Sequence, residues 1–442
     1  MTEAELDRLY PEHLATLMRR ADAALAATGF EALEIRAGTP PLRFLDDQDY
    51  PFKVNPHFKA WVPLEDHPGC VLLYTPGRTP TILFHQPEDY WYASPPLPEG
   101  GWTRQVELVP LRSQADADAY RRRLGRTAVI APPESAAGTE AERLNPAALL
   151  TRLHYERAVK TPYEIACMRR ATEIGVRGHL AAVEAFRAGA CEFAIHHRYL
   201  EACGQREEEM PYNCIVAHNE HAATLHYQRL DRIAPRQRRS LLIDAGAQFR
   251  GYAADITRSH AAESSAYADL VDALDQAQRS LCGEVRAGRD FRDIHRLAHR
   301  AIGEVLREAG VLRISVDDAI ERAVTTVFFP HGIGHLLGLQ VHDVGGVLAD
   351  ADGHENERPP GHPYLRLTRR LEPGVVVTVE PGIYFIDSLL AAARRDQRGD
   401  AIDWERVDAL RPYGGARIED NVVTTSAAPV NLTRESFASA AA

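Results

Sequence analysis

Two apolar, strand-like runs that each lead to an aspartate constrain this chain more than any other feature. Residues 240–243 end at Asp244, and a second run leads through Tyr252 to Asp255. The turn-like sequence at 245–247 follows the first run, so we predict neighbouring strands of a hairpin with both carboxylates facing one cavity. Two buried carboxylates side by side are costly unless a cation lies between them. The pair indicates a cation site, and the alternative is two carboxylates that cap a hairpin end.

Residues 329–343 hold three histidines, His331, His335 and His342, interleaved with glycines and apolar residues. Gly332 and Gly334 let a backbone pass close to a ligand. Gly332 occupies the place that Glu takes in H-E-x-x-H, which excludes a zincin helix. Three histidines in this pattern favour a site, although a single one would more often be a packed or surface residue.

Glu380 ends a β-type run at 375–379, and Glu419 follows Arg417 and Ile418. Each glutamate alone is also explained as a solvated carboxylate at a strand end. Together with Asp244, Asp255 and His335 they form a hard, oxygen-rich set that suits Mn²⁺ or Co²⁺, with Zn²⁺ also possible. Four carboxylates balance two divalent ions, and a paired site can polarise a carbonyl and activate water.

The bulk composition excludes several classes of protein. A chain of 442 residues exceeds one typical core and suggests two domains, or three. A formal net charge of -11 argues against a nucleic-acid partner. The sequence holds no apolar run long enough to span a membrane and begins with acidic, polar residues rather than a secretory signal. Six cysteines without a C-x-x-C pair indicate reduced thiols, and we expect a cytoplasmic protein.

The order of the predicted elements indicates an α/β (α+β) protein. A helix at 12–28 and short strands at 71–74, 81–84 and 128–130 predict a small α/β domain. Thr161, Pro162 and Glu164 then form a strong helix start with a capping box. We therefore place the domains at 1–158 and 159–442. The second domain is predicted to hold a helical stretch over about 263–310 and a loop around 354–363.

The motifs, taken in order, resemble those of the "pita-bread" metallopeptidases, the group of methionine aminopeptidase, aminopeptidase P, creatinase and prolidase. Residues 44–64, 212–213 and 219–227 are similar to bacterial prolidases, whose group also contains organophosphorus acid anhydrolases. The matching motifs are Asp244-Ala245-Gly246, Ala254-Asp255-Ile256-Thr257-Arg258, His331-Gly332-Ile333-Gly334-His335, Glu380-Pro381-Gly382 and Arg417-Ile418-Glu419-Asp420. The resemblance implies a creatinase-like N-terminal α/β domain and a pita-bread domain with a curved, mainly antiparallel sheet.

The resemblance also implies an activity, the cleavage of Xaa-Pro dipeptides with two divalent metal ions, Mn²⁺ before Co²⁺ or Zn²⁺. Asp244 would bind one ion, Asp255 and Glu419 would bridge both, and His335 and Glu380 would complete the second position. Glu380 would also carry a proton from the attacking water to the leaving amine.

Further residues are assigned to the substrate by the same resemblance. His226 and His342 would steady the substrate and the tetrahedral oxyanion, and His331 would line the pocket. Arg366 would grip the C-terminal carboxylate, for which an arginine fork is well suited, unless it is a solvated loop arginine. Two more residues complete the set: Arg417 beside Glu419, and Tyr212 beside the metals.

Other expectations follow from the family. A homodimer is expected, in which Asp46 or Asp47 of one subunit reaches the substrate amine of the other. His221 stands where many relatives carry Asn, which touches no ligand. The alternatives are an aminopeptidase P acting on longer Xaa-Pro peptides, a creatinase-type hydrolase that uses no metal, and a non-catalytic peptide-binding protein. Hydrolysis of organophosphate triesters is a further hypothesis.

Overall fold

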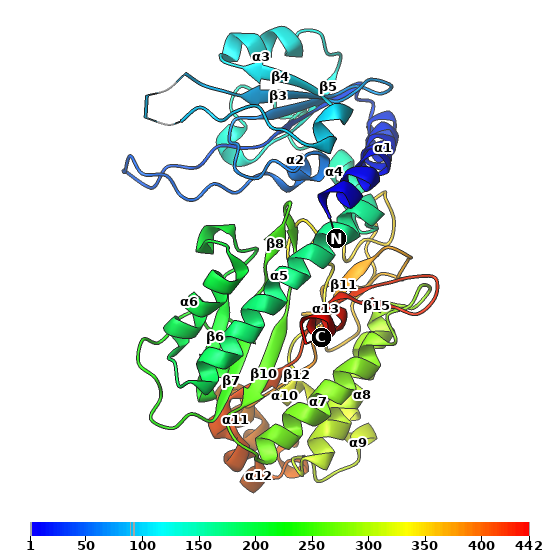
Figure 1. The fold of residues 1–442 in the computed structure, drawn as a ribbon. Coiled ribbons are helices and arrows are strands. Elements are labelled where there is room, and N and C mark those ends of the chain that lie inside the picture. Colours follow the sequence, from blue (N-terminus) through cyan, green and yellow to red (C-terminus); the bar gives the residue numbers. More distant parts are fainter. Residues whose placement is uncertain (1, 89, 92, 442) are drawn as a thin grey trace. The chain divides into compact units, whose positions relative to one another are not determined.

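The computed structural model describes residues 2–88, 90–91 and 93–441, and these form two compact units. The N-terminal unit comprises Met1–Cys167 with the short returns Arg250–Tyr252 and Ala349–His354, and the rest of the chain forms the C-terminal unit. Helix α5 (Pro162–Arg187) contains the point where the two units meet in the sequence. Both units mix helices with strands (Figure 1), so the expected α/β class is confirmed. The division at 158/159 stays a prediction.

The N-terminal unit contains one mixed five-stranded sheet with the order β4-β3-β2-β1-β5. Strands β1, β2 and β3 pair antiparallel, whereas β4 and β5 each add a parallel edge. Apolar side chains of β2, β3 and β4 pack with Ala117 of α3. The bounds are α1 (Glu3–Thr28), β1 (Ala32–Arg36), α2 (Pro56–Trp61), β2 (Val71–Tyr74), β3 (Thr81–His85), β4 (Glu107–Leu111), α3 (Gln114–Arg121), β5 (Thr127–Ile130) and α4 (Ala147–Arg157).

The strands of the C-terminal unit pair antiparallel in the orders β10-β7-β6, β11-β14-β15 and β12-β13. Single bridges extend this pairing between Thr257 and Glu419 and between Leu336 and Val377. The bounds are β6 (Ile215–His218), β7 (Ser240–Asp244), β8 (Gln248–Phe249), β9 (Tyr252–Ala253), β10 (Thr257–Ala261), β11 (Val376–Val379), β12 (Gly382–Tyr384), β13 (Gly415–Arg417), β14 (Asp420–Val423) and β15 (Val430–Asn431).

Helices cover these sheets, and their apolar faces form the core. Ile174 and Phe186 of α5 and Tyr199 of α6 pack against Leu241 and Ile243 of β7. Figure 1 shows α7 and α8 running side by side in the same unit. The remaining bounds are α6 (Glu192–Cys203), α7 (Ala266–Cys282), α8 (Phe291–Glu308), α9 (Val316–Glu321), α10 (Thr325–Phe328), α11 (Asp387–Arg395), α12 (Trp404–Leu410) and α13 (Leu432–Ala440).

Local predictions can be compared with these elements. The capping box at the start of α5 is confirmed, because Thr161 N donates to Glu164 Oε2 and Glu164 N donates to Thr161 Oγ1. The helical stretch predicted over about 263–310 is present as two helices: residues 283–290 separate α7 from α8, and Gly288 there has a φ of 85°, which a helix cannot accommodate. None of the helices in the described residues is long and apolar enough to cross a membrane.

Candidate metal centre

Asp244 is the last residue of strand β7. Strand β10 pairs antiparallel with β7, and Thr257 lies opposite Asp244. The second strand is predicted to lead through Tyr252 to Asp255 as the partner of the first, but β9 ends at Ala253 and pairs with β8, so this part of the prediction is wrong. Asp255 does not lie inside a strand, because Ala254, Asp255 and Ile256 form an irregular link between β9 and β10. The reason is local, since a Cβ on Gly246 would come within 2.0 Å of Ala254 O. This close backbone approach leaves the carboxylate of Asp255 buried next to the end of β7.

His335 is fixed by the edge of β11. Thr378 Oγ1 accepts a hydrogen bond from His335 N at 3.1 Å, and Thr378 N donates to His335 O at 3.0 Å. The imidazole Nε2 then lies 3.4 Å from Asp255 Oδ2 and 3.6 Å from Glu380 Oε1. Glu380 follows directly after β11, as the strand-end pattern predicts.

Asp255, His335 and Glu419 form a compact group. One ligand atom from each lies within 4.8 Å of the others, and all three residues are buried. Thr257 Oγ1 donates to Glu419 Oε2 at 2.6 Å, which orients that carboxylate. Such orientation by a neighbouring hydrogen bond is typical of carboxylate ligands of metals.

The charges of this set are not balanced by the protein alone. Burial raises the pKa of Glu419 well above its usual value, and the nearby carboxylates of Asp255 and Glu380 raise it further. Burial likewise raises the pKa of Asp244 and brings that of Glu380 to about 7. Burial alone would also raise the pKa of Asp255, but the hydrogen bond and charge of His335 outweigh it and lower that pKa.

A divalent cation fits these residues. Oδ1 of Asp255 is buried and has no hydrogen-bond partner among the described residues. An oxygen atom in that condition is costly unless an ion or a water molecule satisfies it. Four carboxylates and one imidazole converge here, a donor set that hard divalent ions prefer.

Arg417 and Tyr212 hold Asp244 from two sides. Arg417 Nη2 donates to Asp244 Oδ2 at 2.5 Å, and the Tyr212 hydroxyl donates to Oδ1 at 2.8 Å. Arg417 also donates to the hydroxyl groups of Thr257 and Tyr384. Its guanidinium therefore contacts Asp244 directly and reaches Glu419 through Thr257.

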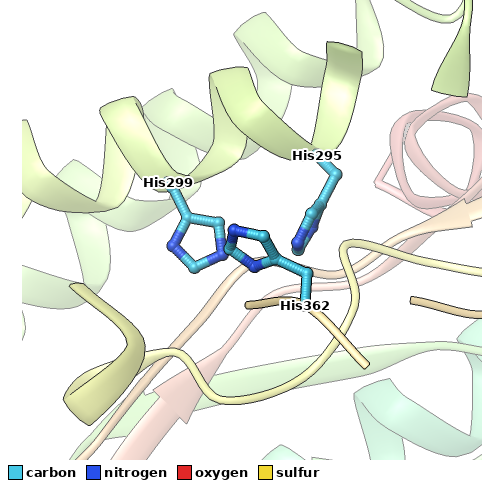
Figure 2. A group of neighbouring side chains, drawn as sticks. All are labelled: His295, His299 and His362. Carbon is cyan, nitrogen blue, oxygen red and sulfur yellow. The ribbon is translucent and has the colours of Figure 1, made fainter. Parts of the chain in front are cut away.

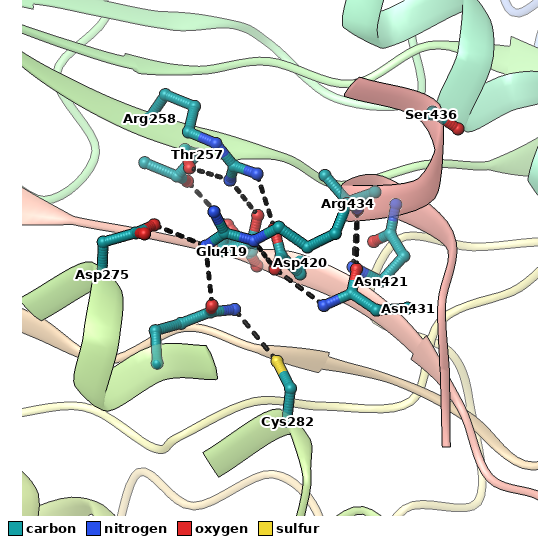
Figure 3. Close-up of polar contacts among 12 residues, drawn as sticks. Thr257, Arg258, Asp275, Cys282, Glu419, Asp420, Asn421, Asn431, Arg434 and Ser436 are labelled. Atoms are coloured by element: carbon teal, nitrogen blue, oxygen red, sulfur yellow. Dashed lines mark hydrogen bonds and ion pairs between the residues drawn. The ribbon is translucent and has the colours of Figure 1, made fainter. Parts of the chain in front are cut away.

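Asp420, the neighbour of Glu419, is the centre of a second buried network (Figure 3). Arg258 Nη2 donates to its Oδ1 at 2.7 Å, and Arg434 Nε donates to its Oδ2 at 2.7 Å. Burial alone would raise the pKa of Asp420, but the two guanidinium groups lower it to about 2. Arg258 Nη1 also donates to Glu419 O at 2.8 Å. The network thus fixes the backbone that carries Glu419.

The histidines expected at the substrate lie around the same set. His331 Nδ1 is 3.6 Å from Glu380 Oε2, and its Nε2 lies 2.9 Å from the Tyr384 hydroxyl oxygen. The ring centroid of His342 is 4.4 Å from that of His335. Burial lowers the pKa of His342 to about 4, and the charges of His335, Arg366 and His226 contribute. Arg366 and His226 are exposed to solvent, and their effect on His342 places both near the site.

Sequence reasoning missed several residues of this site. Thr257 and Arg258 lie within the motif at 254–258, but nothing in the sequence shows that they contact Glu419 and Asp420. Tyr384 lies two residues after the motif that begins at Glu380, and only the pairing of β12 with β13 places it beside Arg417.

Two family models match the chain. Residues 8–155 match the family described as Xaa-Pro dipeptidase, N-terminal domain. Residues 166–426 match metallopeptidase family M24. The chain belongs to metallopeptidase family M24. As an M24 protein it is a metallopeptidase, and the family implies binding of divalent metal.

Relatives of this M24 protein match it over its whole length. It is 50% identical over 442 residues to a protein of Stenotrophomonas maltophilia (strain K279a) named Xaa-Pro dipeptidase, and the match covers 100% of both chains. A protein of Xanthomonas campestris pv. campestris (strain B100) with the same name is 50% identical over 440 residues, which cover 99% of this chain and 100% of that one. The resemblance to bacterial prolidases is confirmed.

Solved structures show the same fold. Pseudomonas aeruginosa aminopeptidase PepP superposes with a TM-score of 0.71 at 23% identity and covers 100% of this chain and 99% of its own. Aminopeptidase P from E. coli with the inhibitor Pro-Leu gives a TM-score of 0.70 at 23% identity, with coverage of 99% and 98%. At this identity the likeness extends to the fold alone.

Proposed function

We propose that this M24 protein is a metal-dependent Xaa-Pro dipeptidase, a prolidase. The observation that carries the proposal is the 50% identity to proteins named Xaa-Pro dipeptidase over 100% of both chains, joined to a buried carboxylate–histidine set of the kind that holds divalent ions. The likeness to aminopeptidase P lies at 23% identity and gives no comparable support for cleavage of longer peptides.

The proposed ligands are Asp244, Asp255, His335, Glu380 and Glu419, which would hold two divalent ions, Mn²⁺ before Co²⁺ or Zn²⁺. When bound, such ions supply Lewis acidity and make water a nucleophile near neutral pH. The unpartnered Oδ1 of Asp255 supports its role as a ligand that bridges two ions. The oxygen-rich donor set supports Mn²⁺.

Glu380 is proposed to move the proton. Burial raises the pKa of this carboxylate to about 7 in the absence of metal, and the charges of His335 and Arg417 act in the opposite direction. A bound cation would lower that pKa, so the proposed role is supported by the position of Glu380, whose Oε1 lies 3.6 Å from His335 Nε2. His331, 3.6 Å from Glu380 Oε2, stands next to that path.

The proposed substrate residues are His226, His342 and Arg366, with Tyr212 and Arg417 holding Asp244 in place. Arg366 lies close enough to His342 to lower its pKa, and it is exposed, as a clamp for an incoming carboxylate must be. A dipeptide ends directly after its proline, so a guanidinium fork at this point would select dipeptides over longer chains.

The deciding experiment compares an Xaa-Pro dipeptide with the matching Xaa-Pro-Xaa tripeptide, using EDTA-stripped protein before and after Mn²⁺ is added. We expect Mn²⁺ to restore cleavage of the dipeptide alone, and Asp255→Asn to abolish it. Preference for the tripeptide would indicate aminopeptidase P activity instead. Absence of turnover of both peptides by protein that has bound metal would favour the non-catalytic peptide-binding alternative.

Three further expectations belong to the same proposal: a homodimer, a cytoplasmic location and hydrolysis of organophosphate triesters. Sedimentation of the purified protein measures the first. For the third, Arg366→Ala should lose most of its dipeptidase activity and keep triester hydrolysis, because a triester has no carboxylate to bind. Lack of triester turnover by the Mn²⁺-loaded wild type would end that hypothesis.

A further inference from the structure

A group of three histidines lies outside the candidate metal centre. His295 and His299 occupy successive turns on one face of α8, and His362 comes from the segment 355–363. Figure 2 shows the three imidazole rings turned toward one another. One ring nitrogen from each lies within 4.8 Å of the others.

The hydrogen bonding of the group is incomplete. His295 is 1% exposed, and neither of its ring nitrogens has a hydrogen-bond partner in the described part of the chain. His299 is 3% exposed, and its Nδ1 lies 3.0 Å from Thr325 Oγ1. Its Nε2 has no partner among the described residues. Buried polar atoms in this condition are rare, and a bound ion or water molecule would satisfy them.

We propose that His295, His299 and His362 form a separate binding site for one divalent transition-metal ion of the zinc class. Three imidazoles suit zinc, cobalt and nickel, whereas the oxygen-rich set at Asp255 suits manganese. Two histidines one helical turn apart supply two ligands from one face of a helix. A third from a neighbouring segment leaves a fourth position for water or a further ligand.

The surroundings of the three rings meet the requirements of such a site. If His299 Nδ1 donates to Thr325, the Nε2 lone pair is available for metal, the arrangement in which an outer partner fixes a ligand histidine. Burial lowers the pKa of His299 to about 3, so its ring is neutral at neutral pH and needs to lose no proton. Phe329 separates the group from the candidate metal centre, with ring-centroid distances of 5.0 Å to His299 and 4.8 Å to His331.

The spacing of the three nitrogens is compatible with one ion. Zinc–nitrogen bonds of about 2.0–2.1 Å in a tetrahedron set the nitrogens about 3.4 Å apart, and the three nitrogens lie within 4.8 Å of one another. His362 is half-buried on a segment without helix or strand, so its side chain can rotate to adjust the spacing. The bound ion would join the segment 355–363 to α8. Its ligand His362 lies four residues before Arg366 in the chain.

The test measures the number of zinc ions bound per chain in variants whose candidate metal centre has been weakened. The background variant carries Asp255→Asn and Glu419→Gln, and the same chain with His362→Gln is compared with it after chelator treatment and dialysis against Zn²⁺. Elemental analysis should show one zinc per chain fewer when His362 is replaced. Replacing the exposed His197 of α6 by Gln is the matched control and should leave the count unchanged.

A second readout does not depend on the background. Zn²⁺ should slow amide hydrogen exchange in residues 355–363 of the wild type and leave His362→Gln unaffected. If the background variant fails to fold, the zinc count of the wild type is compared with that of His362→Gln, and the same loss of one ion is expected. Equal zinc counts with and without His362 would overturn the proposal.

Discussion

The hydroxyl of Thr257 donates to Oε2 of Glu419 at 2.6 Å, and the amide of Glu419 donates to Thr257 O at 3.0 Å. The same hydroxyl accepts a hydrogen bond from Arg417 Nε at 3.2 Å. One buried threonine therefore orients a proposed bridging ligand and the guanidinium that holds Asp244.

Replacing Thr257 by Val should weaken metal binding, because Val fills the same volume and leaves Glu419 without its donor. Loss of such an outer partner typically costs about 10–100-fold in metal affinity. Mn²⁺ titration of EDTA-stripped protein measures this change. Thr257→Ser keeps the hydroxyl and should stay close to the wild type, and equal affinity for the Val variant would contradict the assigned role.

Gly334→Ala should displace His335. A Cβ on Gly334 would lie 2.0 Å from Thr378 O, a backbone atom of the strand edge that fixes His335. We expect loss of metal binding together with lower thermal stability. The control is Gly283→Ala, where the nearest atom to the new Cβ is 3.2 Å away, and there the metal content should be unchanged.

Acid should destabilise the fold through His179 of α5. Burial lowers the pKa of His179 from 6.5 to about 3, and its Nε2 contacts Ala245 O at 3.0 Å. The unfolded chain therefore takes up this proton more readily than the folded one, so stability is lost as the pH falls from 6.5 toward 3. The group contributes up to about 1.4 kcal/mol per pH unit in that range.

His179→Gln tests this effect, because Gln can still donate to Ala245 O but cannot become charged. The free energy of unfolding by urea, measured at about pH 7.5 and about pH 5.5, should fall less in the variant than in the wild type. An equal fall in both proteins would show that His179 does not set the acid sensitivity.

Arg366→Ala should lower kcat/KM for an Xaa-Pro dipeptide by about 10–100-fold, the cost of one hydrogen bond to a charged group. The effect should lie in KM, and Arg366→Lys should recover part of it, since lysine keeps the charge and loses the fork. A dipeptide amide, which has no carboxylate, should be cleaved at similar rates by both proteins. Arg370→Ala removes a neighbouring exposed arginine and should leave the kinetics unchanged.

Local sequence patterns correctly predicted the features that depend only on residues close together in the chain. The capping box at Thr161 and Glu164 and the strand that ends at Asp244 depend on neighbouring residues, and both are present. The irregular link that holds Asp255 depends on the approach of Gly246 to Ala254 O, which alternation of apolar residues does not reveal.

Contacts between distant segments could not be predicted in the same way. Thr257 and Glu419 meet because a single bridge joins β10 to the residue before β14, and no spacing in the sequence indicates that register. The three-histidine group shows both situations. His295 and His299 stand one helical turn apart and could have been noticed, whereas His362 joins them only through the path of an irregular segment.

Asp420 needs Arg434 of α13, which follows all the proposed ligands in the chain. A chain cut short before α13 would contain Asp244, His335 and Glu419 but would lack one of the two cations that neutralise the carboxylate beside Glu419. The last helix, which supplies no proposed ligand, is therefore needed to hold the backbone of one of them in place.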